Sequence, residues 1–258
     1  MTDVAEAVTA AFHEEWGRLV ASLISYAGDW DLAEDCVQEA FTLAWRTWPR
    51  DGVPDRPGGW LLTVARHRAL DRLRRGRVGE AKLQQLAMSK DAGPSEPNFD
   101  ALDSGIEDER LRLIYTCCHP ALAFEAQVAL ALRTLTGLST AEIARAFGVP
   151  EATMAKRLVR AKRKIRDAGI PYRVPPTHLL PERTRAVLGV VYLLFNEGYV
   201  ATSGADLHRP VLAKEALRLA ALLVELMPDD PEVRGLNALV LLHQSRSSTR
   251  GAATRRTA

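Results

Sequence analysis

Apolar residues recur at three- and four-residue spacing along almost the whole chain, and no alternating strand pattern persists for more than a few residues. This periodicity predicts an all-α protein built from amphipathic helices, each with one face packed inward. The expected helices span residues 4–27, 30–48, 58–76, 105–118, 122–136, 139–147, 151–168, 181–196, 210–227 and 231–244.

Two breaks divide these helices into modules. Residues 91–98 combine Asp, Gly, Pro, Ser and Asn, a composition typical of a flexible polar linker. Residues 169–176 contain three prolines, which stop a helix and open a new module. The predicted organisation is a small helical domain at 1–79, a flexible linker at 80–104, a helix-turn-helix domain at 105–170, a helical-hairpin C-terminal extension at 171–244 and a disordered tail at 245–258.

Charge is segregated along the chain, although the net charge of the 258 residues is only +2. Residues 29–39 hold five acids and no base. Residues 60–77 hold six arginines against one acid, and residues 145–166 hold eight Lys or Arg against one acid. Two basic islands predict two separate contacts with a polyanion.

Composition bounds the class of protein. With 47% hydrophobic and 26% charged residues the chain is expected to be globular. No apolar run approaches the roughly 18 residues of a membrane span, and the first residues are acidic where a signal peptide is basic. We therefore expect a cytoplasmic protein that does not bind a membrane, with its three cysteines reduced.

The helix expected at 30–48 has two unlike faces. Its apolar stripe, expected to pack inward, is Ala33, Cys36, Val37, Ala40, Phe41, Ala44 and Trp45. Its polar face is expected to show Glu34, Asp35, Gln38, Glu39 and Thr42. That face is a compact acidic surface suited to a basic partner protein, and the alternative is a helix face that is simply solvated.

The helix expected at 58–76 combines arginines with an aromatic ring. Leu62, Ala65, Ala69 and Leu73 share its buried face, while Trp60, Thr63, His67, Asp71 and Arg74 lie opposite, flanked by arginines. Arginine neutralises phosphate and an aromatic ring stacks on an unpaired base, so the combination favours single-stranded DNA. A core position is the alternative for Trp60.

The second basic island follows a helix-turn-helix pattern. Ser139 and Glu142 have the spacing of a capping box, and Gly148 is suited to a left-handed turn between two helices. In the second helix the expected core residues are Met154, Leu158, Ala161 and Ile165, and the expected outward residues are Glu151, Ala152, Thr153, Lys156, Arg157 and Arg160. Such a pair places a recognition helix in the major groove of duplex DNA, whereas an ordinary helical hairpin is the alternative.

Two further motifs are interpreted structurally. Cys117, Cys118 and His119 lack the spacing of a zinc site, so we expect a packed helix end and no metal. Residues 195–199, Phe-Asn-Glu-Gly-Tyr, are expected to close a helix with a tight turn. The chain contains no P-loop, nucleophile elbow or metalloprotease motif, so we expect neither an enzyme nor a cofactor.

Residues 31–41 followed by 59–75 resemble conserved region 2 of the extracytoplasmic-function (ECF) sigma factors, and residues 137–165 resemble their region 4. Residues 177–244 resemble the tetratricopeptide-like extension of a subgroup of that family. The resemblance implies that the chain binds core RNA polymerase, through the β′ clamp helices and the β flap, and directs it to promoter DNA, both as duplex and as melted strand.

The same resemblance assigns roles to particular residues. Those expected to bind polymerase are Asp35, Gln38, Glu39 and Glu34. Those expected at the −10 element are Trp60, Arg66, His67, Arg68, Asp71, Arg74 and Arg75, with His67 where relatives often carry Asn. Those expected at the −35 element are Ala152, Thr153, Lys156, Arg157, Arg160, Lys162 and Arg163.

Two other functions fit parts of this pattern. A stand-alone helix-turn-helix regulator explains the second basic island but leaves Trp60 and the acidic helix without a role. A tetratricopeptide-like scaffold explains the extension but not the ordered motifs that precede it. Transcription with core polymerase separates the three, because only a sigma factor confers start-site-specific RNA synthesis by itself.

Overall fold

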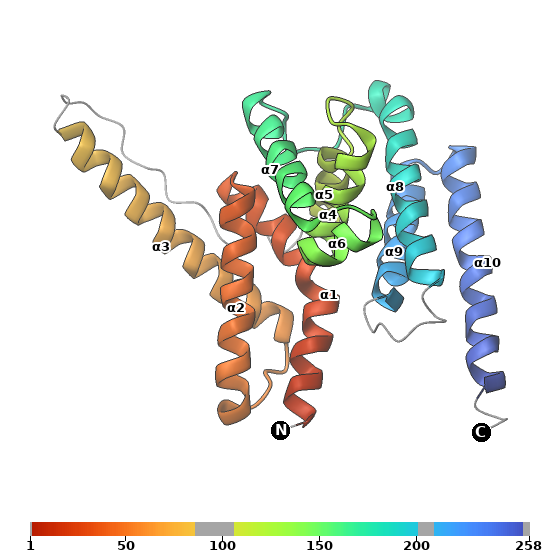
Figure 1. The fold of residues 1–258 in the computed structure, drawn as a ribbon, viewed down its shortest axis with the longest axis horizontal. Coiled ribbons are helices and arrows are strands. Elements are labelled where there is room, and N and C mark those ends of the chain that lie inside the picture. The colour runs from red at the N-terminus through yellow and green to blue at the C-terminus, as the bar shows by residue number, and fades with distance from the viewer. Residues whose placement is uncertain (1, 86–105, 201–208, 255–258) are drawn as a thin grey trace. The chain divides into compact units, whose positions relative to one another are not determined.

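The computed structural model describes residues 2–85, 106–200 and 209–254, and every element in these ranges is a helix, which confirms the all-α prediction. The chain divides into two compact units, residues 1–109 and residues 110–258. Each unit is described by itself below. Figure 1 shows the course of the helices.

The first unit is built from three long helices, α1 (Thr2–Ala27), α2 (Trp30–Asp51) and α3 (Pro57–Gln85). A tight turn joins the first two: Gly28 has a left-handed backbone (φ 68°), and the Asp29 carboxylate accepts bonds from the first free amides of α2. All three helices pack on one another, and in Figure 1 α3 crosses α1 and α2 obliquely. Helix α3 begins against α1 at Gly58, where a Cβ would come within 2.5 Å of the Arg18 and Glu15 side chains.

The core of this unit is rich in tryptophan. All five tryptophans of the chain lie in α1–α3. Trp16 and Trp48 are almost completely buried, and Trp16 packs on Phe12 and Phe41. Large indole rings bury much apolar area for each ordered side chain, which allows three helices to hold a stable core.

The second unit begins with four helices that contain the expected helix-turn-helix: α4 (Ile106–Cys117), α5 (Phe124–Thr136), α6 (Thr140–Ala146) and α7 (Glu151–Asp167). The capping box is confirmed, since Ser139 N–H donates to Glu142 and Glu142 N–H donates to the Ser139 hydroxyl. Gly148 is left-handed (φ 61°), as expected of the turn. The predicted core face of α7 is confirmed too: Met154, Leu158, Ala161 and Ile165 are buried.

Three longer helices follow in the same unit: α8 (Leu180–Val200), α9 (Arg209–Leu226) and α10 (Pro231–Thr254). In Figure 1 they run alongside one another. Two predicted ends were wrong. Residues 195–199 continue α8 instead of forming a turn, and α10 continues to Thr254 through most of the tail expected to be disordered. Leu194 and Phe195 are buried on the inward face of α8, and packing of that face extends this helix past a weak local stop signal.

Helices α8 and α9 pack directly on the helix-turn-helix domain, so that the extension belongs to one compact unit with it. Arg110 of α4 pairs with Glu215 of α9 at 3.0 Å, and both side chains are largely buried. The Tyr115 and Thr184 hydroxyls are 2.7 Å apart, which joins α4 to α8. These bonds were not expected for an extension predicted as a separate module.

The predicted linker is only partly described. Helix α3 runs to Gln85, beyond the expected linker start at residue 80, and residues 86–104 lie outside the described residues. Among the helices that are described, none has the length and apolarity needed to span a membrane.

Candidate functional site

The outer face of α2 carries the expected polar residues, with one correction. Asp35 and Gln38 are exposed, and Glu39 is partly exposed. Glu34 was wrongly placed on this face, because its side chain is only 5% exposed. The physical reason is that α2 packs against both α1 and α3, so its covered face is wider than a single apolar stripe.

Trp45 is the second correction on α2. It was expected in the inward stripe, but it is 56% exposed, and Trp48 one turn away takes the buried place. Residues 35, 38, 42 and 45 follow helical spacing and are all exposed, so Trp45 shares its face with Asp35, Gln38 and Thr42. Sequence reasoning missed Trp45 as a surface residue, and a large exposed aromatic beside acids is a signal of an interaction surface.

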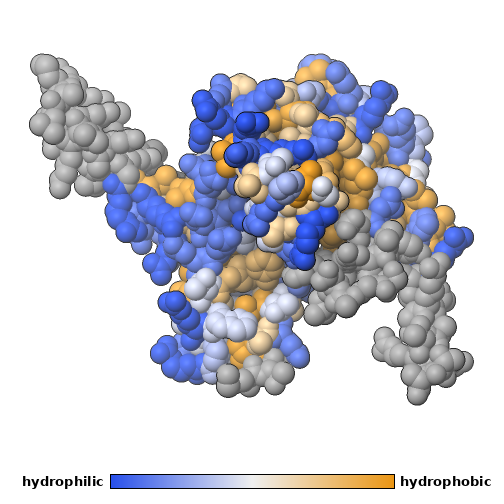
Figure 2. All heavy atoms as spheres, viewed as in Figure 1, coloured by the Kyte–Doolittle hydropathy of each residue, from blue (hydrophilic) through white to orange (hydrophobic). Residues whose placement is uncertain are grey.

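Acidic residues of α2 bond to arginines of α3, in an arrangement that we call the charge ladder (Asp35, Glu39, Arg68 and Arg72). Arg72 donates to Glu39 and, at 3.3 Å, to Asp35. Arg68 lies 3.9 Å from the other oxygen of Glu39. Asp35 pairs with Arg72, and Glu39, one turn later on α2, also reaches Arg68, one turn earlier on α3. This order is expected of antiparallel helices. Figure 2 shows mainly hydrophilic side chains over α2 and α3.

Arg72 is the functional candidate that sequence reasoning missed on α3. Burial alone lowers its pKa, but the nearby Cys36, Glu39 and Asp35 groups outweigh this and raise the pKa above its ordinary value. The guanidinium is therefore fixed as a cation between two carboxylates. The only trace of this arrangement in the sequence is the matching spacing: two acids, Asp35 and Glu39, are four residues apart, and so are two arginines, Arg68 and Arg72.

The predicted −10 residues on α3 do not all share one surface. His67, Arg68, Asp71, Arg74 and Arg75 are exposed. Arg66 is partly buried and donates to the Ser22 hydroxyl of α1 at 3.5 Å. Trp60 is half-buried with its ring edge-on to Trp48 at 5.6 Å between ring centroids, so it belongs partly to the core and partly to the surface.

The predicted −35 residues lie on α7. Ala152, Thr153, Lys156, Arg160 and Arg163 are exposed, while Arg157 and Lys162 are partly exposed. The Arg157 guanidinium lies over the Phe147 ring at 5.6 Å, a contact that orients it at the helix-turn-helix bend. Arg163 is paired with Asp167 at 3.0 Å. The face is therefore basic, with small residues at its N-terminal end.

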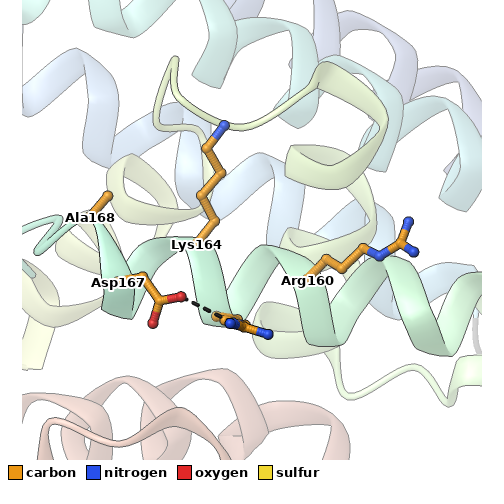
Figure 3. A pocket seen from close by; sticks show the side chains of 5 residues that line it. Arg160, Lys164, Asp167 and Ala168 are labelled. Carbon is orange, nitrogen blue, oxygen red and sulfur yellow. Dashed lines mark hydrogen bonds and ion pairs between the residues drawn. The ribbon is translucent and has the colours of Figure 1, made fainter.

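Two hollows border the basic side of α7. The first, of about 410 Å³, lies between α7 and the start of α5 and is lined by Ala121, Leu122, Ala123, Ala126, Thr153, Lys156, Arg157, Arg160, Ala161 and Lys164. The second, of about 520 Å³, is shared by Arg160, Arg163, Lys164, Asp167 and Ala168. Figure 3 shows Lys164 pointing away from Asp167 on the same helix. Lys164 was not among the expected site residues and adds a cation to both hollows.

The Cys-Cys-His segment is a packed helix end, as expected. Both thiols are buried, and Cys117 Sγ lies 3.4 Å from the Thr134 hydroxyl. Burial raises the pKa of Cys118 well above its ordinary value, so this thiol stays protonated at neutral pH. Across the described residues, no group of three or more His, Cys, Asp or Glu side chains is arranged to hold a metal ion.

An acidic and aromatic face, a basic helix and a helix-turn-helix are features typical of a nucleic-acid-binding protein with a protein partner. Comparison with known families agrees. Residues 12–78 match sigma-70 region 2, residues 112–165 match sigma-70 region 4, and residues 183–257 match a family of unknown function, DUF6596. Two segments of the chain therefore belong to the sigma-70 region 2 and sigma-70 region 4 families.

Three curated relatives are similar to parts of this chain. An uncharacterized protein of Rhizobium meliloti, R00370, is 42% identical over 90% of this chain and 55% of the relative. The probable ECF RNA polymerase sigma factor SigI of Mycobacterium tuberculosis is 30% identical over 66% of this chain and 58% of the relative. ECF sigma factor SigL of the same species is 29% identical over 61% of this chain and 85% of the relative. The chain thus spans little more than half the length of the first two relatives.

Proposed function

We propose that this chain is a sigma factor without enzymatic activity that binds core RNA polymerase and directs it to promoters through −10 and −35 DNA recognition. The observation that carries the proposal is the order of three surfaces. The polar face of α2 comes first, the arginine face of α3 second and the basic face of α7 third, within segments that match sigma-70 regions 2 and 4. This role would place the protein in the cytoplasm with polymerase and chromosome.

The polymerase contact is proposed on α2, at Asp35, Gln38 and Glu39, with Trp45 as an apolar anchor. Interfaces concentrate binding free energy in a few aromatic or charged residues surrounded by a polar rim. The exposed Trp45 ring, about two to three turns from these polar groups, has that composition. The β′ clamp helices are the proposed partner of this face, and the β flap is a second proposed contact of the chain with polymerase.

The −10 contact is proposed on α3, at His67, Arg68, Asp71, Arg74 and Arg75. Trp60 is proposed to stack on an unpaired base, because it is half-buried beside Trp48 and therefore held in a fixed orientation. Stacking of a base on an aromatic side chain is worth about 1–3 kcal/mol, which offsets the few kcal/mol needed to unstack it. Opening of the DNA strands would then be driven by binding free energy, without hydrolysis of a nucleotide.

The −35 contact is proposed on α7. Ala152 and Thr153 at its N-terminal end are short enough for the backbone to approach base edges. Lys156, Arg160 and Arg163, with the partly exposed Arg157 and Lys162, would neutralise phosphates on either side. The contact of Arg157 with Phe147 supports a fixed orientation for that guanidinium.

A reconstituted transcription assay tests the proposal. Purified chain is added to core RNA polymerase with genomic promoter templates, and RNA start sites are mapped. A sigma factor gives defined starts that are absent with core enzyme alone. Failure to bind core enzyme, or random initiation at every template, contradicts the proposal. A helix-turn-helix regulator would change initiation only when another sigma factor is present.

A further inference from the structure

The charge ladder joins two surfaces to which the proposed function gives different partners. Asp35 and Glu39 belong to the proposed polymerase face, and Arg68 and Arg72 belong to the DNA-facing helix α3. Arg72 lies one turn from Arg68 and from Arg75, on the same helix as the exposed Arg74. The same four charges are thus within reach of a basic protein on one side and of phosphates on the other.

These contacts compete with both partners. Two carboxylates and two guanidinium groups sum to zero charge, so the acidic face of the free protein is less acidic than its sequence indicates. A basic protein surface that bonds Glu39 has to displace Arg72, and a phosphate that bonds Arg72 has to displace Glu39. The side chains of the charge ladder are accessible, with exposures of 32% for Arg72, 44% for Glu39 and 61% for Asp35. An outside partner can therefore replace an ion pair of the ladder without unfolding of the protein.

We propose that the ladder is an electrostatic latch: docking of a basic polymerase surface on Asp35 and Glu39 releases Arg68 and Arg72 to bind DNA phosphates. The inference rests on the proposed function and adds a means of regulation to it. The free chain holds two of its DNA-facing arginines on its own carboxylates. The polymerase-bound chain has them available.

Linkage makes the effect reciprocal. If polymerase docking raises the affinity for DNA by a given factor, DNA raises the affinity for polymerase by the same factor. Partly exposed ion pairs are worth at most about 1 kcal/mol each, so releasing two arginines should tighten DNA binding by about two- to tenfold at low salt. The coupling is small enough to be reversed easily and large enough to disfavour DNA binding by free protein.

The test replaces the carboxylates with neutral isosteres and needs no polymerase. Full-length Asp35→Asn/Glu39→Gln protein is titrated against a fluorescent single-stranded oligonucleotide at several salt concentrations. The matched control is Glu6→Gln/Asp55→Asn, which removes two exposed carboxylates outside the ladder and changes the net charge equally. Intrinsic tryptophan fluorescence checks that both variants are folded.

The latch predicts tighter DNA binding for Asp35→Asn/Glu39→Gln than for the control, by about two- to tenfold. It also predicts a steeper salt dependence, by about 0.7 in log affinity against log salt for each arginine that gains a phosphate. Adding Arg72→Gln should remove most of the gain. Equal affinity and equal slope in the ladder variant and the control would overturn the inference.

A second measurement separates this inference from the proposed function. The same variant should bind core polymerase more weakly while it binds DNA more tightly, so one substitution moves the two affinities in opposite directions. If the wild-type chain does not bind polymerase at all, the proposed function fails whatever the DNA result. If polymerase binding weakens and DNA binding stays at the control value, only the latch fails.

Discussion

Helices α3 and α7 carry the two basic surfaces of the chain, but they hold their positive charge differently. On α3, Arg66 bonds Ser22 of α1, and Arg68 and Arg72 face the carboxylates of α2. On α7, Lys156, Arg160 and Lys164 make no ion pair with any residue that the structure describes. Part of the charge on α3 is therefore already satisfied within the protein, whereas these three cations of α7 face solvent.

The difference teaches that equal counts of basic residues do not give equal nucleic-acid affinity. An arginine bonded to a carboxylate must lose that bond before it gains a phosphate, while a solvated lysine or arginine loses only counterions and water. We expect α7 to bind duplex DNA in the free protein and α3 to bind strongly only after α2 is engaged.

The buried pair Arg110–Glu215 joins α4 to α9 in the unit that contains α7. Replacing Arg110 with Met should lower the free energy of unfolding of the second unit by about 3 kcal/mol, because Glu215 is left buried without its cation. Thermal unfolding followed by circular dichroism measures the loss. Arg185→Met, at an exposed position of α8, is the control and should change stability by less than about 0.5 kcal/mol. Equal stability of the two variants would show that the pair does not hold the extension on α4.

The polymerase face of α2 should depend on Trp45. Replacing Trp45 with Ala should weaken binding to core polymerase by about thirtyfold, or about 2 kcal/mol, because an aromatic anchor is lost. Folding should be unaffected, since the ring is 56% exposed. Competition with a labelled sigma factor measures the affinity, and Val53→Ala, also exposed and apolar, is the control. An unchanged affinity would remove Trp45 from the docking face.

The unpaired cations of α7 should make the affinity for duplex DNA strongly dependent on salt concentration. Lys156→Gln/Arg160→Gln should make the slope of log affinity against log salt shallower by about 1.8, since each phosphate contact contributes about 0.9. The control Arg185→Gln/Lys214→Gln changes two exposed cations of α8 and α9 by the same charge. Fluorescence anisotropy with upstream promoter duplex gives both slopes. If the two double variants give the same slope, α7 is not the duplex-binding surface.

The smallest effect is a pH dependence of stability from Glu215. Burial raises the pKa of Glu215 above its ordinary value, although Arg110 and Arg218 oppose the shift. The folded chain therefore holds this proton more tightly than the unfolded chain does, and the associated stability is complete below the ordinary pKa and is lost as pH rises through the folded pKa. Wild type should gain stability relative to Glu215→Gln as pH falls through this window. A constant difference in unfolding midpoint across it would contradict the raised pKa.

The sequence predicted the helices well because most have strong local signals. The capping box at Ser139, the left-handed Gly148 and the apolar stripe of α7 all act within one or two turns, so no knowledge of the fold is needed. The wrong end of α8 has the opposite origin. Gly198 is a weak stop signal in α8, and packing of this helix against α9 overrides it. The polar residues after Gln244 are exposed as far as Arg246 and do not stop α10.

The site was predicted less completely because it depends on which helices meet. Periodicity placed Trp45 and Glu34 by a single stripe. In the structure α2 packs against two helices and covers Glu34, and Trp48 takes the buried position that was expected for Trp45. Arg72 was missed because its role depends on the register between α2 and α3, which no local pattern encodes. The burial of Arg110 against Glu215, 105 residues apart, was unpredictable for the same reason.

Because every indole of the chain lies in α1–α3, the two compact units carry different natural chromophores. Excitation at the red edge of protein absorbance reports on the first unit alone, while circular dichroism follows all helices together. Melting curves recorded by the two signals will coincide only if both units lose structure together. A single unlabelled sample can thus reveal which unit a bound oligonucleotide protects.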